Sequence, residues 1–232
     1  MLKNLRLDLN PSSVSCDFEQ AAIKSIKIAF PNVQIFGCLF HLTKNIRKQL
    51  GELHLISQYN NISDFAVSVK MIVALAFVEL ENLDAAVDAL AEYLSEEFHT
   101  LLEWFEDNYI GRVNRNGRGR RHARFPPDIW NLYNRVLNSQ DRTNNHAEVA
   151  NRRLNVEMRV CHPSIWAFID CLKKVQSGHD YFYSQLTAGK SPPKKFKKFA
   201  DLDKRILKIV QQYDSREYIS YLKGIAYNIS LP

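Results

Sequence analysis

The chain has 232 residues, of which 46% are apolar and 24% charged, with a net charge of +6, and this composition excludes collagen, low-complexity and wholly disordered chains. Four Cys without a CxxC pair exclude a disulfide scaffold and argue against a zinc finger or ribbon. The first residues lack the apolar core of a signal peptide, and no apolar run is long enough to cross a bilayer, so we expect a soluble intracellular protein without a membrane partner.

The first fifty residues predict a strand, a helix, a second strand and a second helix. Residues 13–16 favour a short strand, and the apolar residues of 18–30 recur at helical spacing. Residues 33–38 (VQIFGC) predict a buried strand, and residues 39–50 predict a helix that Gly51 terminates. This order is typical of a fragment of an α/β unit.

The rest of the chain predicts helices. Residues 64–78 are strongly apolar, and Asn82 caps an acidic, amphipathic helical stretch that continues to Phe105. Further helices are expected around Trp130 and Tyr133, from about residue 144, after Pro163, and as a basic arm over residues 196–222.

These elements predict an α-rich α/β chain in four segments. They are a partial core (1–52), a helical insertion with an Arg-rich loop (53–140), C-terminal helices of the core (141–190) and a basic helical tail (191–232). Two strands are too few for a sheet core. Either the chain is nearly all-α with a β-ribbon, or it is the later part of an α/β domain whose first strands precede Met1; the buried character of VQIFGC favours the second interpretation.

The charges are segregated along the chain. Residues 71–111 hold ten acids and no Lys or Arg, whereas five lysines lie within residues 190–198. A second basic cluster follows the acidic stretch and comprises Arg112, Arg115, Arg118, Arg120, Arg121 and Arg124. Guanidinium groups pair well with phosphate oxygens, so this loop is a candidate nucleic-acid-binding segment. The alternative is a solvated loop that balances the acidic helices.

Asp17 and the pair Cys38–His41 are candidates for chemistry at the ends of the two strands. A carboxylate at a strand end is well placed to bind a metal, but Asp17 with Gln20 also fits a capping box. Cys38 and His41 form a CxxH that would supply half of a metal site, with Cys161–His162 as a conceivable completion. The alternative is a buried thiol and a locally hydrogen-bonded imidazole.

Glu148 is the candidate acid of the later part of the chain. With Asn144 and Asn145 it falls on one helical face, which would place two amides and a carboxylate together. The alternative is an i,i+4 ion pair between Glu148 and Arg152.

Taken in order, these pieces resemble the Mutator-like element (MULE) transposases. The stretch CDFEQAAIKSIKIAFPNVQIFGCLFHLTKNIRKQLG resembles the DFE-A-A opening, FP break and GC-F-H of that family. The stretch FPPDIWNLYNRVLNSQDRTNNHAEVANRRLN, followed by HPSIWAFI, resembles its later F-P…W…RTNN…E…N and HP..W segments. The resemblance covers residues 1–176.

The resemblance implies a truncated RNase H-like fold with two remaining strands, interrupted by an all-helical insertion. It implies that Asp17 and Glu148 are the second and third acids of a DDE triad and would bind Mg²⁺ or Mn²⁺ for phosphoryl transfer on DNA in the nucleus. Cys38 and His41 would be a structural motif close to that site. The D-G-T-like segment of the first acid has no counterpart here, which predicts a fragment that is inactive alone.

Three hypotheses follow. The chain is an inactive part of a MULE catalytic domain, a transposon-derived module that binds nucleic acid or protein without catalysis, or a helical interaction domain whose acidic hairpin is the contact surface. If the first strands are missing, an unpaired sheet edge predicts self-association.

Overall fold

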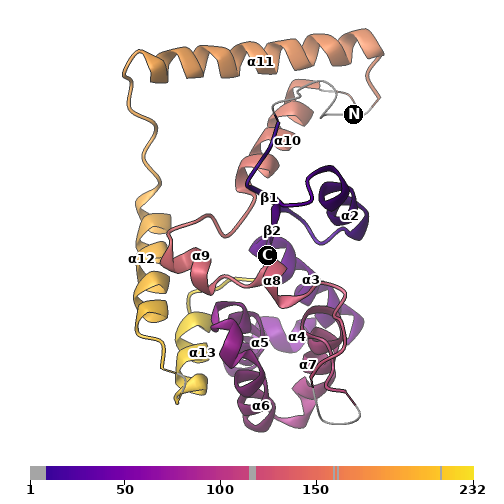
Figure 1. The fold of residues 1–232 in the computed structure, drawn as a ribbon, viewed down its shortest axis with the longest axis vertical. Coiled ribbons are helices and arrows are strands. Elements are labelled where there is room, and N and C mark those ends of the chain that lie inside the picture. The colour runs from indigo at the N-terminus through magenta and orange to yellow at the C-terminus, as the bar shows by residue number, and fades with distance from the viewer. Residues whose placement is uncertain (1–8, 115–118, 159, 161, 215) are drawn as a thin grey trace. The chain divides into compact units, whose positions relative to one another are not determined.

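The computed structural model describes residues 9–114, 119–158, 160, 162–214 and 216–232. This part of the chain is an α-rich α/β structure with a two-stranded sheet (Figure 1). It divides into a first unit, Met1–Thr143 with Asp201–Pro232, and a second unit, Asn144–Ala200, which are described separately here. Within the described ranges, no helix combines the length and apolarity needed to cross a membrane.

The sheet belongs to a β–α–β element at the start of the first unit. Strand β1 (Ser13–Cys16) pairs in parallel with β2 (Gln34–Gly37), and helix α2 (Gln20–Ala29) connects them. In the register, Cys16 lies opposite Gly37. A Cβ on Gly37 would come within 2.7 Å of the Phe18 ring, so only glycine allows this approach. The predicted order of the first elements is therefore confirmed, with α2 starting two residues later than expected.

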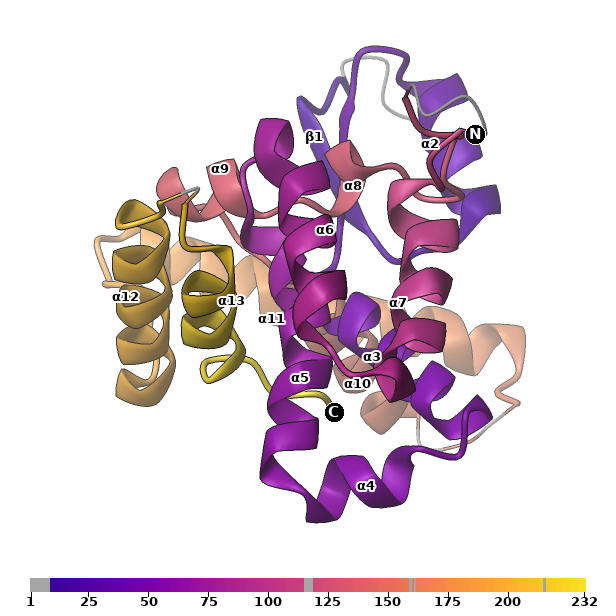
Figure 2. The same ribbon diagram turned by 90° about the horizontal axis from the view of Figure 1, so that it is seen from below.

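The helices of the first unit follow the sheet and return at the end of the chain. They are α3 (Leu39–Glu52), α4 (Ile56–Asn61), α5 (Ser63–Ala74), α6 (Leu83–Tyr93), α7 (His99–Phe105), α8 (Pro127–Trp130), α9 (Tyr133–Leu137), α12 (Lys197–Gln211, in its larger part) and α13 (Tyr218–Ala226). Short 3-10 turns cover Leu75–Phe77, Leu80–Asn82 and Glu96–Phe98, and a π-helical turn covers Glu106–Ile110. Helix α13 lies beside α5 and α6 (Figure 2).

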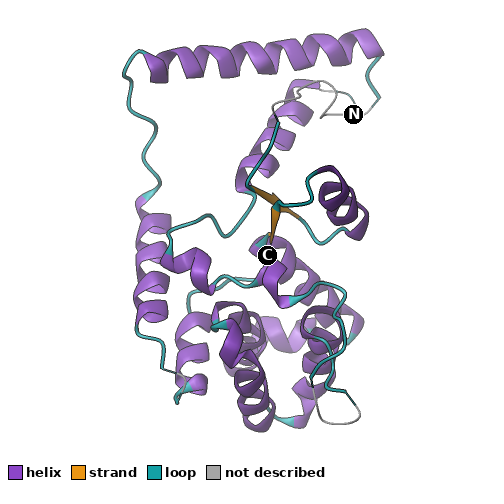
Figure 3. Ribbon diagram, in the orientation of Figure 1, coloured by secondary structure: helices purple, strands orange, loops and turns teal. Residues whose placement is uncertain are grey.

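Two helices differ from the sequence prediction in where they end or break. Gly51 does not end α3, which continues to Glu52. The helix expected around Trp130 is broken between α8 and α9 (Figure 3). Asn131 causes the break: its Nδ2 donates to Val78 O at 2.7 Å, and its Oδ1 accepts from the backbone nitrogen of Tyr133 at 3.0 Å.

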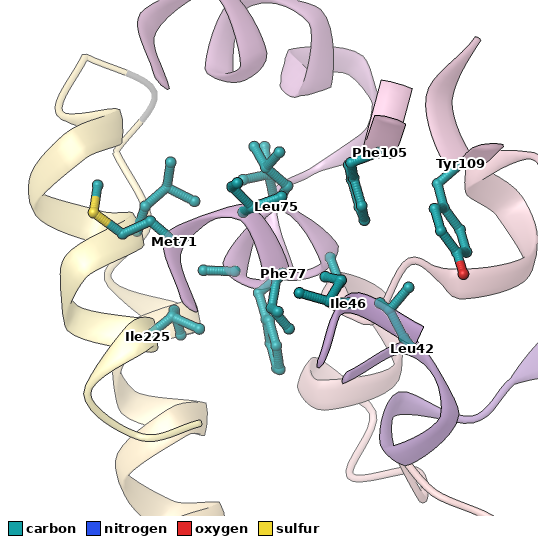
Figure 4. Close-up of a cluster of buried hydrophobic side chains, with 14 of the residues drawn as sticks. Leu42, Ile46, Met71, Leu75, Phe77, Phe105, Tyr109 and Ile225 are labelled. Atoms are coloured by element: carbon teal, nitrogen blue, oxygen red, sulfur yellow. The ribbon is translucent and has the colours of Figure 1, made fainter. Parts of the chain in front are cut away.

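The core is built around the apolar stretch that ends α5. Every residue from Met71 to Val78 has no exposed surface. Figure 4 shows Leu42 and Ile46 of α3 directed toward this stretch, with Ile225 of α13 on its other side. Helix α13 is therefore a core helix, and the prediction of a basic helical tail over residues 191–232 did not anticipate its burial. The apolar residues of α13 explain its burial.

The second unit consists of helices α10 (Asn145–Met158) and α11 (Ile165–Thr187), which pack against each other. Both start where the sequence predicts. The Oγ of Ser164 accepts a hydrogen bond from the Ala167 nitrogen at 3.3 Å and caps α11, as Ser commonly does. Cys171 contacts the Leu154 carbonyl oxygen at 3.8 Å, and Gly178 makes room for the Arg153 guanidinium. These two positions define the face of α11 that packs on α10.

Candidate functional site

Asp17 follows directly after β1, at the carboxyl end of the strand, and is partly buried. Helix α2 begins at Gln20 with Glu19 as its N-cap residue, so the capping-box interpretation of Asp17 is wrong. The amide of Gln20 instead donates to the Arg124 carbonyl at 3.3 Å. Phe18 lies between strand and helix, and the helix begins only after this residue, whose ring packs on two aromatic rings of the first unit.

Cys38 lies at the same end of the sheet as Asp17. Its backbone nitrogen donates to Cys16 O at 3.0 Å, and its thiol is fully buried at the N-cap position of α3. Burial, followed by the charge of Asp17 and by Cys38, raises the pKa of Cys16 to about 11, so this thiol is protonated at neutral pH. His41 lies in the first turn of α3 with its ring edge-on to Phe40 at 5.5 Å.

The segment that leads to Glu148 is held at this same sheet edge. The Leu39 backbone nitrogen donates to Arg142 O at 2.9 Å. Arg135 is 4% exposed, and its Nη1 donates to Gly37 O at 3.0 Å while its Nη2 binds Asp141 O. Burial lowers the pKa of Arg135 to about 10, so the group remains charged at neutral pH. Two stretches about a hundred residues apart in sequence thus meet where Asp17 leaves its strand.

Arg135 was missed by the sequence analysis, because a single Arg in an aromatic helical stretch carries no motif. Its guanidinium lies 4.6 Å from the centre of the Phe36 ring, which stabilises the buried charge. The signal that could have found it is three-dimensional: both of its acceptors are backbone carbonyls of distant segments.

Glu148 lies in the first turn of α10, in the second unit, and is exposed. The Asn144 carbonyl accepts from the backbone nitrogens of Ala147 at 2.9 Å and Glu148 at 3.3 Å, so the helix begins here as predicted. The shared face with Asn145 involves a side chain outside the described residues, and the pair with Arg152 stays a prediction. Asp17 and Glu148 belong to different units, so the structure gives no geometry between the two carboxylates.

The Arg-rich loop makes ion pairs with the acidic helices. Arg112 contacts Asp107 and, at 3.6 Å, Glu103. Arg120 binds Asp84 at 2.6 Å and Glu106 at 2.8 Å, and its side chain is 11% exposed. For these two arginines the structure agrees with the alternative of charge balance. Arg121 and Arg124 are exposed, and Arg115 and Arg118 lie outside the described residues.

We expect Arg120→Ala to lower the free energy of unfolding by about 2 kcal/mol, because it leaves the partly buried Glu106 and the Gly111 carbonyl without their donor. Arg112→Ala removes an exposed pair and should cost about 0.5 kcal/mol or less. Urea unfolding followed by circular dichroism measures both. Equal losses for the two variants would contradict the ranking.

A cavity of about 290 Å³ opens beside Phe18 in the first unit. Asn45, Lys48, Trp104 and Arg124 contribute to its lining. Asn45 Nδ2 donates to the Tyr109 hydroxyl at 2.9 Å, and burial raises the pKa of Tyr109 to about 12. The sequence analysis missed this cavity because its lining comes from segments far apart in the chain.

Models of known protein families, curated proteins and solved structures were all compared with this chain, and none of them matches it. The donors described at the sheet edge are the Asp17 carboxylate, the thiols of Cys16 and Cys38, and backbone carbonyls. Mg²⁺ prefers oxygen ligands and is usually held by one or two carboxylates together with substrate phosphates. Asp17 fits as one such ligand, whereas the protonated Cys16 thiol does not. Among the described residues, no three His, Cys, Asp or Glu side chains gather into a metal-binding group.

Proposed function

We propose that this chain is the part of a MULE-type transposase catalytic domain, with an RNase H-like fold, that carries the second and third acids. The observation that carries the proposal is the meeting of three segments at one sheet edge. Asp17 leaves β1 there, Cys38 begins α3 there, and the backbone of Arg142 is bound there by Leu39. Glu148 follows Arg142 by only six residues in the sequence.

In this proposal Asp17 and Glu148 hold Mg²⁺ or Mn²⁺ through their carboxylate oxygens. When bound, the divalent ions activate a water or a DNA 3′-hydroxyl and stabilise the leaving oxygen. Arg135 fixes the segment before Glu148 to the end of β2, and the buried Cys38 occupies the N-cap position of α3. Because two of three acids are assigned to this chain, we propose that it does not cleave DNA by itself.

Iron-directed cleavage of the protein tests whether the two carboxylates share an ion. Fe²⁺ takes the place of Mg²⁺, and with ascorbate and peroxide it cuts the backbone close to its ligands. We expect cuts near both Asp17 and Glu148 that excess Mg²⁺ suppresses. Asp17→Asn should remove both sets of cuts, and the matched control Asp128→Asn, at an exposed position of α8, should remove neither. Mass spectrometry of the fragments reads the positions.

Three results would count against the proposal. Cuts near Glu148 that persist in Asp17→Asn would mean that the acids do not share a site. Strand cleavage or joining of DNA by the purified chain with Mg²⁺ or Mn²⁺ would mean that it is active alone. Binding of DNA without any iron-directed cut would favour a module without a metal site.

A further inference from the structure

The net positive charge of the chain comes from the second unit. The stretch Asn144–Ala200 contains 10 of the 31 Lys and Arg residues and 4 of the 25 acids, which is a net charge of +6. The first unit contains the remaining 21 basic and 21 acidic residues and has no net charge. The whole excess of the protein therefore lies on α10, α11 and the lysines that follow them.

The first unit neutralises several of its cations internally. Arg120 lies between Asp84 and Glu106 and is nearly buried. Arg142 pairs with Asp203 in the same unit. The Arg-rich loop, which the sequence analysis favoured for nucleic acid, thus uses Arg120 and also Arg112 for its own fold.

In the second unit, basic side chains are exposed on both helices and in the stretch that follows α11. They are Arg152, Arg153, Lys173, Lys174, Lys190, Lys194, Lys195, Lys197 and Lys198. On α11, Cys171 and Gly178 face α10. With 100° of rotation per residue, Trp166 and Lys173 fall on the opposite side, whereas Lys174 lies about 50° from the side of Cys171 and Gly178.

The second unit also has no core of its own. Among its described residues, Cys171 alone is buried. Large apolar side chains are exposed instead, including Trp166 at 73%, Tyr181 at 66% and Tyr183 at 72%. Burial of apolar surface is what offsets the entropy of ordering a chain, so such a hairpin gains stability when a partner covers it.

We propose that the second unit, the α10–α11 hairpin together with the lysines that follow it, is an arm that binds DNA, with its lysines and arginines on the phosphate backbone and its exposed aromatic rings against the sugars and bases. Charge complementarity selects this partner, because DNA is polyanionic and the second unit, with the lysines that follow α11, carries the net positive charge of the chain. A second copy is a poorer partner, since two surfaces of net charge +6 repel each other. Exposed rings beside cations are the arrangement on which unstacked bases bind.

This inference shares with the proposed function only the use of DNA, and it requires neither Asp17 nor Glu148. Asp17→Asn should therefore bind DNA as wild type does even if it loses every iron-directed cut. A failure of the metal site and a failure of the hairpin are distinguishable in this way.

The test measures binding of a fluorescein-labelled DNA duplex with single-stranded ends by anisotropy over a series of salt concentrations. The double variant Lys173→Gln/Lys174→Gln removes two exposed cations of α11. We expect it to weaken binding on the order of tenfold and to reduce the slope of log K against log salt by about 2, one for each lost phosphate contact. The matched control Arg121→Gln/Arg124→Gln removes the same charge from the Arg-rich loop and should weaken binding less than about threefold, through long-range electrostatics alone.

A second readout uses Trp166, the exposed one of the three tryptophans; Trp104 is partly buried and Trp130 is buried, and both belong to the first unit. DNA should quench the tryptophan fluorescence of the wild-type chain and leave that of Trp166→Phe unchanged. Circular dichroism confirms that each variant keeps its helices. An equal or larger loss in the loop variant, or no binding by wild type at low salt, would overturn the proposal.

Discussion

Trp130→Ala is expected to lower the free energy of unfolding by about 4 kcal/mol, the typical cost of removing a fully buried indole. Trp130 is 1% exposed, and its Nε1 donates to Tyr109 O at 2.8 Å and to Phe125 O at 3.0 Å. Its ring packs edge-on against Phe105 at 5.5 Å. The substitution leaves a cavity and two buried carbonyls without this donor, and both effects destabilise the folded state.

The chain contains a matched control in Trp166, which is 73% exposed. Trp166→Ala makes the same chemical change on the surface and should stay within about 0.5 kcal/mol of wild type. Trp130→Phe keeps an aromatic ring but loses the donor, and about 2 kcal/mol is expected. Urea unfolding followed by circular dichroism at 222 nm gives all three values. A loss in Trp166→Ala as large as that in Trp130→Ala would contradict the difference in burial between the two residues.

Local patterns sufficed where neighbouring residues decide the structure. Hydrophobic periodicity and the residues that start or end helices predicted three features. They are the β–α–β order, the starts of α10 and α11, and the burial of the apolar stretch from Met71. The position of Asp17 at a strand end was also predicted, because the strand and the following break are adjacent in sequence.

Long-range contacts decided the rest. Asn131 interrupts a helix because Val78 O, 53 residues earlier, accepts its amide hydrogen. Helix α13 was expected to be a basic arm, yet the Tyr221 hydroxyl donates to Phe77 O in the core. Arg120 looked like a phosphate ligand because Asp84, its partner, is 36 residues away. In each case the deciding partner lies too far along the chain for a local pattern to reveal it.

Arg135 also has a hydrogen-bond partner far along the chain, the Gly37 carbonyl. Arg135→Met is expected to lower the free energy of unfolding by about 3 kcal/mol. Met keeps much of the volume and apolar contact of the Arg stem, so the loss of stability reflects mainly the missing hydrogen bonds. Without the guanidinium, the carbonyls of Gly37 and Asp141 lose a buried donor, and each such loss costs about 1–3 kcal/mol. Arg135→Lys keeps a charge but has a single donor group, and about 2 kcal/mol is expected.

Hydrogen exchange separates a positioning role for Arg135 from general destabilisation. The Leu39 amide donates to Arg142 O across the contact that Arg135 supports, whereas the Leu42 amide donates within α3 to Cys38 O at 3.1 Å. If Arg135 holds residues 141–142 on the sheet edge, Arg135→Met should accelerate exchange at Leu39 by tenfold or more beyond the change at Leu42. Arg121→Met, at an exposed loop position, should change neither amide. Equal acceleration at Leu39 and Leu42 would mean that Arg135 stabilises the unit as a whole, and the segment before Glu148 would then need another anchor.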